Sequence, residues 1–388
     1  MDGDRAEPTS NTAVGLCLLP SELIHEILLR LSIPDLLLLR AVSRTLSSLL
    51  ASSDFRRLYS PASSGPCLFV LTKRFPRDAL LRVFHPASSR WLRLPSALLP
   101  SSTDPYLLAA SGDHILFASN SRRELLALNL SSRSISTLPH PPLGPRRTSS
   151  WRRSGLKLIS DGSHFRFLFA EIVGDRPFLY EYGSVTGTWR SSEAVTNLQP
   201  VRGGVWLNLV QFGNESVILR AGPSDEDYPI VLRPRLSAAL IPRQVEDPLR
   251  VYGGDGKMVV VRSTAVGVGM RVVTAVEVWA VTAAAGGGVA WEMVTAAPEE
   301  VVEKIRRPFG VMMGCMEEEN ESMGMIMRLR IVLVSNLEGS WAITWLGRDA
   351  AGCWVWVPVP APESGSTGFF NMAGIVLSSC FSGLSLLF

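Results

Sequence analysis

The apolar residues of this 388-residue chain change their spacing once, near residue 60. Before that point Leu23, Ile24, Ile27, Leu28 and Leu31 recur at the spacing of one helix face. Beyond it, apolar residues fall in short runs bounded by Gly, Pro, Ser, Asn or Asp, which is the pattern of β-strands joined by turns. The sequence therefore predicts a small helical segment followed by a long all-β region.

The helical segment carries start signals for successive helices. Pro20 and Glu22 suit the first turn of helix one, and Pro34 and Asp35 repeat these signals for helix two. We expect helix two to continue through residue 50 and a short third helix to begin at residue 53 or 54.

This segment has more leucine than its own interior can hold. Residues 36–39 are four consecutive leucines, which occupy every side of a helix. A bundle of about 40 residues lies below the size at which one core usually gives independent stability. Burying one leucine contributes about 1.5 to 3 kcal/mol, so a few surplus leucines suffice for a docking surface. The surplus either packs on the downstream region as a cap or binds a partner.

The segment resembles an F-box, whose pattern opens with Leu-Pro, continues through spaced leucine and isoleucine to a second proline, and closes with Phe. The matching residues are Leu19, Pro20, Ile27, Leu28, Leu31, Pro34, Val42, Arg44 and Phe55. Ser43 replaces the usual cysteine and Leu46 the usual aromatic residue, and both are expected to keep the helical register.

This resemblance implies docking on a Skp-type adaptor and, through it, on a cullin-RING ubiquitin ligase. The residues it assigns to the adaptor contact are Leu19, Pro20, Leu23, Ile27, Leu28, Leu31, Pro34, Leu36, Leu37 and Val42.

The all-β region of roughly 320 residues is too long for one simple sandwich, which suggests repetition. Trp91, Trp189 and Trp291 lie 98 and 102 residues apart, or two units of about 50 residues each time, the kelch period. The region resembles the degenerate kelch propellers of plant F-box proteins, with about six blades. Gly203-Gly204 and Gly253-Gly254 are candidates for the paired glycines of that family. A non-kelch β domain of other plant F-box proteins is the rival interpretation.

The predicted organisation is mainly β, with a disordered leader over residues 1–15, an F-box over 16–60 and a kelch-like propeller over 61–388. Within the chain's last segment, residues 374–379 and 383–388 are predicted to be strands that pair with residues 67–71 and close the ring. A membrane tail anchor over 369–388 is disfavoured by its two glycines, four serines and missing basic flank.

Charge and motifs exclude several classes of function. The formal net charge of +3 gives no field for nucleic acid or an anionic membrane. Five dispersed cysteines without a C-x-x-C pair favour a reducing compartment, nucleus or cytoplasm, and predict no metal site. The five histidines show no paired spacing, and no phosphate loop or nucleophile elbow occurs, so we expect neither cofactor nor catalytic residues.

Three polar stretches remain. Residues 253–256 are predicted to be a tight turn between strands. Residues 144–157 hold five basic residues and no acid; a solvated loop between blades is favoured over a contact for phosphate, an acidic peptide or nuclear import. The acidic residues 315–324 are predicted to form a mobile loop.

Together these features predict a non-catalytic substrate-recognition subunit of a Skp-cullin-F-box (SCF) ubiquitin ligase. Its propeller would bind a target protein whose identity cannot be read, because recognition loops vary on a fixed scaffold. The alternative is a kelch scaffold or ligand-binding propeller that the helices only cap, and an enzyme with a site in the central channel is the third hypothesis.

Overall fold

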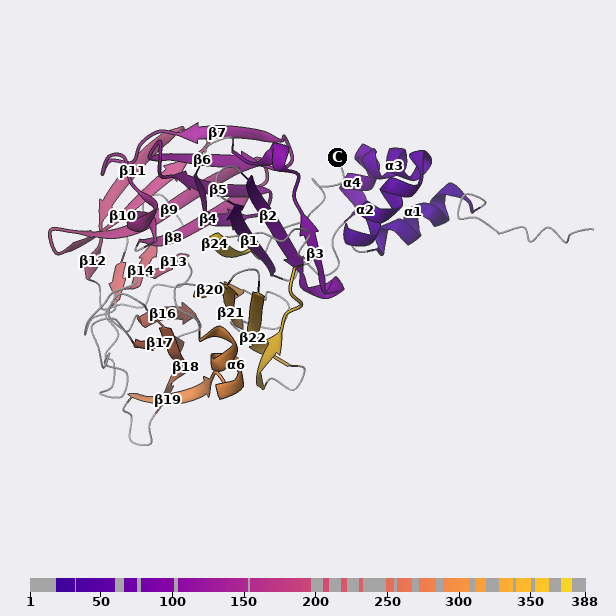
Figure 1. Cartoon of the computed structure of the whole chain (residues 1–388). Coiled ribbons are helices and arrows are strands. Elements are labelled where there is room, and N and C mark those ends of the chain that lie inside the picture. The colour runs from indigo at the N-terminus through magenta and orange to yellow at the C-terminus, as the bar shows by residue number, and fades with distance from the viewer. Residues whose placement is uncertain are drawn as a thin grey trace, which may run out of the picture. The chain divides into compact units, whose positions relative to one another are not determined.

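The structure, a computed structural model, describes residues 19–31, 33–59, 66–74, 78–100, 104–152, 154–196, 205–208, 218–221, 230–232, 249–254, 257–266, 272–283, 289–306, 311–318, 328–337, 340–349, 353–362 and 371–378. The helices before residue 60 belong to one compact unit and the described strands to another (Figure 1). The predicted leader, residues 1–15, lies outside the described residues.

The helical unit contains α1 (Ser21–Leu29), α2 (Ile33–Val42), α3 (Arg44–Ala51) and α4 (Ser53–Leu58). Its core is made of buried apolar side chains from all four helices and the residue after them, namely Ile24, Leu28, Leu36, Leu46, Leu50, Phe55 and Tyr59. Ser52 caps α4, because its hydroxyl accepts a hydrogen bond from Phe55 N at 3.1 Å.

The prediction of one continuous second helix is wrong at Ser43. This residue is extended (φ −142°, ψ 131°), and its hydroxyl accepts a hydrogen bond from Leu46 N at 3.4 Å. Ser43 therefore ends α2 and caps α3, and it does not keep the helical register. After the break, α3 begins as a separate helix, on which Leu46 and Leu50 are buried.

The β unit contains six four-stranded sheets among the described residues (Figure 1). Sheet I consists of β24 (Asn371–Ser378), β1 (Cys67–Arg74), β2 (Asp78–His85) and β3 (Arg90–Arg93). Sheet II consists of β4 (Pro105–Ser111), β5 (His114–Ser119), β6 (Glu124–Asn129) and β7 (Ser134–Leu138). Sheet III consists of β8 (Gly155–Asp161), β9 (His164–Val173), β10 (Arg176–Gly183) and β11 (Thr188–Glu193).

The remaining sheets follow in chain order. Sheet IV pairs β12 (Val195–Thr196), β15 (Ile230–Leu232), β14 (Ile218–Ala221) and β13 (Val205–Asn208) in that order. Sheet V consists of β16 (Leu249–Gly254), β17 (Lys257–Val266), β18 (Val272–Ala283) and β19 (Val289–Ala296). Sheet VI consists of β20 (Val311–Glu318), β21 (Arg328–Leu337), β22 (Ser340–Arg348) and β23 (Trp354–Pro358). Short helices α5 (Thr148–Trp151) and α6 (Glu299–Ile305) connect sheets II to III and V to VI, and 3-10 turns lie at Pro86–Ser88 and Ser96–Leu98.

The fold is a β-propeller with five regular blades, sheets I, II, III, V and VI, in which every pairing is antiparallel. Sheet IV departs from this plan, because β12 precedes its neighbours in the chain and pairs with β15 in parallel. The about six blades predicted from the sequence thus correspond to five regular blades and one irregular sheet.

One strand of each sheet faces the centre of the ring. β24 contacts β4 and β20, β4 contacts β8, and β13 contacts both β8 and β16. The hydrophobic cores lie between neighbouring sheets rather than within one. Leu116 and Phe167, for example, share a cluster across sheets II and III, and Val278 and Leu333 share one across sheets V and VI. Each blade therefore depends on the next for burial of its apolar face.

Tryptophan side chains link the outer strands of neighbouring sheets. Trp189 of β11 donates its indole N–H to the carbonyl of Pro139, just after β7, at 2.8 Å. Trp91 donates in the same way to Pro360 at 2.7 Å, and Trp356 to Ala296 at 3.1 Å. Trp91, Trp189 and Trp291 lie on the outer strands of sheets I, III and V, which confirms the predicted spacing of two units.

The structure describes parts of the three polar stretches of the sequence. Of the turn predicted at 253–256, Gly253 and Gly254 are the last residues of β16, and Gly254 pairs with Lys257 of β17; residues 255 and 256 lie outside the described residues. The described residues from 144 to 154 lie in the connection from β7 to β8, whereas residues 155–157 belong to β8 itself; the expected solvated loop is wrong for Arg146, Trp151 and Ser154, which are buried. The acidic stretch is not a loop at residues 315–318, which pair with Arg328–Ile331 and set Glu318 opposite Arg328; residues 319–324 lie outside the described residues.

The predicted closure is confirmed for its first strand. β24 pairs with β1 along its length, from Cys67 opposite Ser378 to Lys73 opposite Asn371, and the two lie side by side in Figure 1. Sheet I thus joins the beginning and the end of the β region. The second predicted strand, residues 383–388, lies outside the described residues.

Gly374 allows this closing strand to fit. The pairing of β24 with β1 shifts between Val70 and Thr72, a bulge, and Gly374 there has φ +123°. A Cβ on Gly374 would overlap the carbonyl oxygen of Leu107 in β4 and lie 2.8 Å from the Leu107 Cβ. Only glycine meets both demands, a positive φ and a close approach to the backbone of the next blade.

We predict that Gly374→Ala lowers the free energy of unfolding of the propeller by roughly 3 kcal/mol, because strain and overlap act together. Gly187→Ala is the matched control: Gly187 also has a positive φ, +67°, but nothing lies within 4 Å of its missing Cβ. The control should lose only about 1 kcal/mol. Urea unfolding followed by tryptophan fluorescence measures both, and equal losses would show that the approach to Leu107 is unimportant.

Candidate functional site

Helix α1 has two apolar faces. Ile24 and Leu28, four residues apart, are buried in the helical unit with exposures of 8% and 0%. Leu23 and Ile27, also four apart, are exposed at 51% and 36%. Residues four apart lie above one another on a helix, so each pair forms a stripe. One stripe builds the core, and the other is open to solvent.

The same division occurs on the other helices. Leu36 of α2 is fully buried, whereas Leu38 and Val42, four residues apart, are exposed at 59% and 80%. Leu58 of α4 is exposed at 56%. We call Leu23, Ile27, Leu38, Val42 and Leu58 the outer apolar set. Burying each such side chain on a partner is worth about 1.5 to 3 kcal/mol before the costs of association.

Nine of the ten residues predicted to contact an adaptor fall into three classes of exposure. Those exposed are Pro20, Leu23, Ile27 and Val42; those half-buried are Leu19, Leu31 and Leu37; and those buried are Leu28 and Leu36. The side chain of Pro34 lies outside the described residues. Leu38 and Leu58 were missed as surface residues, although the four-residue spacing of Leu38 and Val42 was a signal for the first.

The outer apolar set is carried on a unit held together by a specific polar contact. The hydroxyl of Tyr59, just after α4, donates a hydrogen bond to the carbonyl of Leu31 between α1 and α2 at 2.9 Å. Its ring stacks on Phe55 with centroids 5.5 Å apart. Burial, and then the negative charge of Asp35, raise the pKa of Tyr59 to about 12, so the phenol is neutral and able to donate.

Comparison with known families bears on this unit. Residues 16–58 match the family model of the F-box domain. These residues form an F-box domain. The four helices, the core and the outer apolar set all lie within or directly beside this F-box.

No curated protein matches the chain at a significant level. Among solved structures, a "putative 6-phosphogluconolactonase" from Bacteroides fragilis NCTC 9343 is 10% identical, with a TM-score of 0.34, covering 78% of this chain and 98% of its own. A xylan beta-1,4-xylosidase from Bacillus halodurans C-125 is 12% identical, with a TM-score of 0.31, covering 68% of this chain and 59% of its own. Likenesses this distant support no functional argument.

The described part of the chain holds no group of three or more His, Cys, Asp or Glu side chains placed to bind a metal ion. Within it, no helix has the length and apolar character needed to cross a membrane. Cys67 is buried, which raises the pKa of its thiol to about 12 and makes it a poor nucleophile.

His114 of β5 illustrates a histidine with a structural role. The amide oxygen of Asn129 accepts from Ser132 N at 3.1 Å, which leaves its NH2 to donate to His114 Nε2 at 3.1 Å. Nδ1 therefore carries the proton and donates to Ser160 Oγ at 2.8 Å. The neutral ring thus bridges sheets II and III, and burial lowers its pKa.

We predict that Tyr59→Phe lowers the free energy of unfolding of the F-box helices by about 1 kcal/mol, the usual value for a lost hydrogen bond. The neutral Tyr59 phenol stabilises the fold fully below its ordinary pKa of 10.0, and this stabilisation is lost as pH rises toward about 12. Helical circular dichroism during urea unfolding at pH 8 and pH 10.5 tests this. The difference in free energy of unfolding between wild type and variant should be smaller at pH 10.5 than at pH 8. An equal difference at the two pH values would contradict the assignment.

We also predict that acid weakens the propeller through His114. Since its folded pKa is below the ordinary 6.5, the neutral ring contributes stability fully above pH 6.5, and this is lost as pH falls below that value. His114→Gln, which keeps an acceptor for Asn129 but cannot titrate, should lose less stability between pH 7 and pH 5 than wild type. His85, whose pKa burial also lowers, is present in both proteins and cancels in the comparison. Identical pH profiles would refute the role of His114.

Proposed function

We propose that this chain is the substrate-recognition subunit of an SCF ubiquitin ligase. The F-box domain docks on a Skp-type adaptor, and through it on a cullin-RING ligase, while the propeller binds a target protein. Other subunits transfer the ubiquitin, and no bond is made or broken by residues of this chain. This proposal rests on the family match of residues 16–58 and on the surface that these residues present.

The observation that carries the proposal is the outer apolar set. Five large apolar side chains on three helices are exposed while a separate set fills the core, so they are not needed to fold the F-box. Val42 at 80% and Leu38 at 59% would be unfavourable solvent contacts without a partner. An adaptor with a complementary apolar groove supplies the missing cover, as the F-box match implies.

The propeller supports the second half of the proposal. Its strands and inter-sheet cores form a rigid scaffold, and its connecting segments can vary without disturbing that scaffold. We assign it to the kelch type found in plant F-box proteins, because the tryptophans recur at the kelch spacing and link neighbouring blades. A chain that works with a cullin-RING ligase is expected in the nucleus, the cytoplasm or both.

The direct test places a charge in the outer apolar set. Ile27→Asp should weaken binding to a purified Skp-type adaptor by at least about 2 kcal/mol, roughly thirtyfold in Kd, because the carboxylate would be buried unpaired in the contact. Ser48→Asp is the matched control, since it adds the same charge at an exposed position of α3 in the same unit. Isothermal titration calorimetry gives both Kd values, and circular dichroism confirms that both proteins fold.

Leu28 is unsuitable for this test, although the sequence pattern ranks it with Ile27. Leu28 is fully buried, so a charge there would unfold the F-box and abolish binding for an uninformative reason. Equal adaptor affinity for wild type, Ile27→Asp and Ser48→Asp would rule out the outer apolar set as the docking surface. A folded wild type with no adaptor affinity would favour the alternative, a scaffold or ligand-binding propeller capped by its helices.

A further inference from the structure

The basic residues of this chain are almost all arginines. Of 38 basic residues, 34 are arginines and four are lysines, namely Lys73, Lys157, Lys257 and Lys304. Residues 1–72, which include the F-box, contain six arginines and no lysine. Either side chain supplies a positive charge to a solvated surface, so the need for surface charge does not explain the choice of arginine.

Lysine and arginine differ in how they react with an activated carboxyl group. The neutral ε-amine of lysine is a nucleophile, and lysine is the residue to which ubiquitin is attached. The guanidinium of arginine stays protonated in proteins and does not attack. A chain that carries its charge on arginine therefore offers few acceptor sites, although the proposed function places it beside enzymes that transfer ubiquitin.

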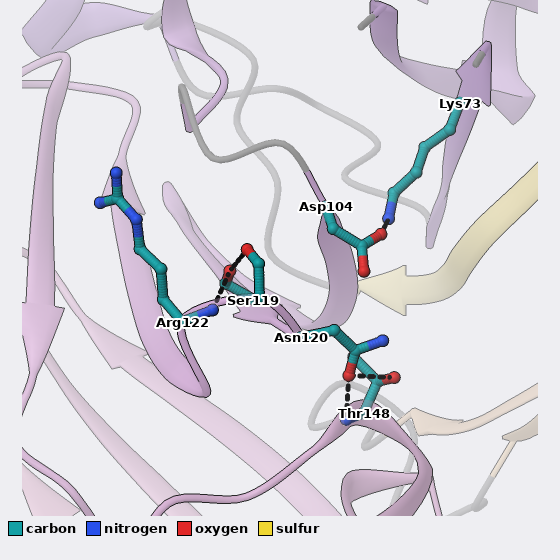
Figure 2. A network of polar contacts seen from close by, with 7 residues as sticks. Lys73, Asp104, Ser119, Asn120, Arg122 and Thr148 are labelled. Carbon is teal, nitrogen blue, oxygen red and sulfur yellow. Dashed lines mark hydrogen bonds and ion pairs between the residues drawn. The ribbon is translucent and has the colours of Figure 1, made fainter. Parts of the chain in front are cut away.

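Lys73 of β1 is held in an ion pair. Its ammonium group contacts the carboxylate of Asp104, which directly precedes β4, as Figure 2 shows. Its side chain is only 22% exposed. The pair joins sheet I to the start of sheet II, so it would have to break before Nζ of Lys73 could react.

Lys157 lies inside the ring of blades. It is half-buried on β8, the strand of sheet III that contacts β4 and β13 of the neighbouring sheets. A conjugating enzyme that carries ubiquitin has poor access to such a strand. Lys257 begins β17, opposite Gly254, and its side chain lies outside the described residues.

Lys304 is the exposed lysine of the described structure. It lies in the last turn of α6, whose Val302 and Ile305 are buried at 5% and 1%, and Ile305 belongs to the core shared by sheets V and VI. The neighbouring Glu303 is engaged by Arg306. Within the described part of the chain, no acidic side chain forms an ion pair with Lys304. Its amine is thus presented to solvent on an anchored helix.

We propose that Lys304 is the residue at which this chain itself accepts ubiquitin, and that arginine in place of lysine shields its F-box from the same modification. The proposal rests on the proposed function, because it places the chain beside the ubiquitin-transferring subunits. The turnover of the receptor would then depend on one side chain, separately from the modification of its target.

The reaction joins Lys304 to a ubiquitin thioester carried by a conjugating enzyme. Nζ of the neutral amine attacks the thioester carbonyl at the carboxyl terminus of ubiquitin. An isopeptide C–N bond forms, the C–S bond breaks, the enzyme's cysteine leaves as a thiolate, and the amine releases a proton to solvent. Lys304 supplies only the attacking electron pair, so the chain is an acceptor in this reaction and not its catalyst.

The experiment combines the full chain with a Skp-type adaptor, a cullin, a RING subunit, ubiquitin and its activating and conjugating enzymes, without a target protein. Mass spectrometry of tryptic peptides locates the attached ubiquitin, which wild type should carry chiefly at Lys304. Lys304→Arg keeps the charge and should remove most of the ubiquitin attached to the chain. In the isolated chain, an N-hydroxysuccinimide ester should acylate Lys304 faster than Lys73 and Lys157.

Lys73→Arg is the matched control. It makes the same substitution, keeps a cation for Asp104 and should leave the amount of attached ubiquitin unchanged. A rescue variant combines Lys304→Arg with Arg306→Lys, which moves the amine two residues along the chain to a side chain that is 46% exposed. This variant should regain ubiquitin, now at residue 306. Thermal unfolding of all variants checks that they fold.

Several results would overturn the proposal. They are ubiquitin located mainly at Lys73, Lys157 or Lys257, equal ubiquitin on wild type and Lys304→Arg, no recovery in the rescue variant, and slower acylation of Lys304 than of Lys73 or Lys157. An adaptor-bound chain that accepts no ubiquitin also contradicts it. Pull-down of the adaptor from the same mixture separates these failures from that of the proposed function, because a chain without adaptor affinity refutes the proposed function and this proposal together.

Discussion

The antiparallel pairing of β24 with β1 is the contact on which the propeller depends. It completes sheet I from the two ends of the β region and brings β24 against β4 and β20. The entropic cost of closing a loop grows only with the logarithm of its length, so joining such distant segments costs little more than joining close ones. The ladder of hydrogen bonds and the core shared by Leu68, Val332 and Leu377 offset that cost. Closure also leaves β1 without an open inner edge, which would otherwise be a site for aggregation.

Around the ring, the same type of hydrogen bond recurs between neighbouring sheets although the sequences around it differ. Among the described residues, an indole N–H reaches a carbonyl at or just beyond the outer strand of the preceding sheet in three places, although the accepting residues are Pro139, Ala296 and Pro360. A backbone carbonyl accepts equally well from any residue type, so only the tryptophan has to recur. For Trp91 and Trp189, this explains why the tryptophan spacing predicted the blade repeat when the surrounding residues did not. The order of sheet IV could not be predicted, because the parallel pairing of β12 with β15 joins segments that share no local pattern.

In the F-box, the sequence predicted a surplus of apolar side chains but not which ones form it. Ile27 and Leu28 are adjacent and chemically similar, yet one is 36% exposed and the other fully buried, because a rotation of about 100° per residue separates them. Which side faces inward is decided by where α2, α3 and α4 pack. Their directions depend on the break at Ser43. The side chain of Ser43 caps a new helix there, whereas the apolar pattern predicted one continuous helix. Local periodicity carries no information about such a cap when no glycine or proline marks it.

Arg146 and Arg147, in the connection from β7 to β8, show the same limit, since these neighbouring arginines have opposite environments: Arg146 is buried and Arg147 is exposed. The burial of Arg146 needs Glu171 from β9 and the ring of Trp151, contacts that a basic run in the sequence does not reveal. The docking proposed for the F-box is apolar, so its strength depends little on the screening of charges by salt, and it suits a lasting attachment to an adaptor.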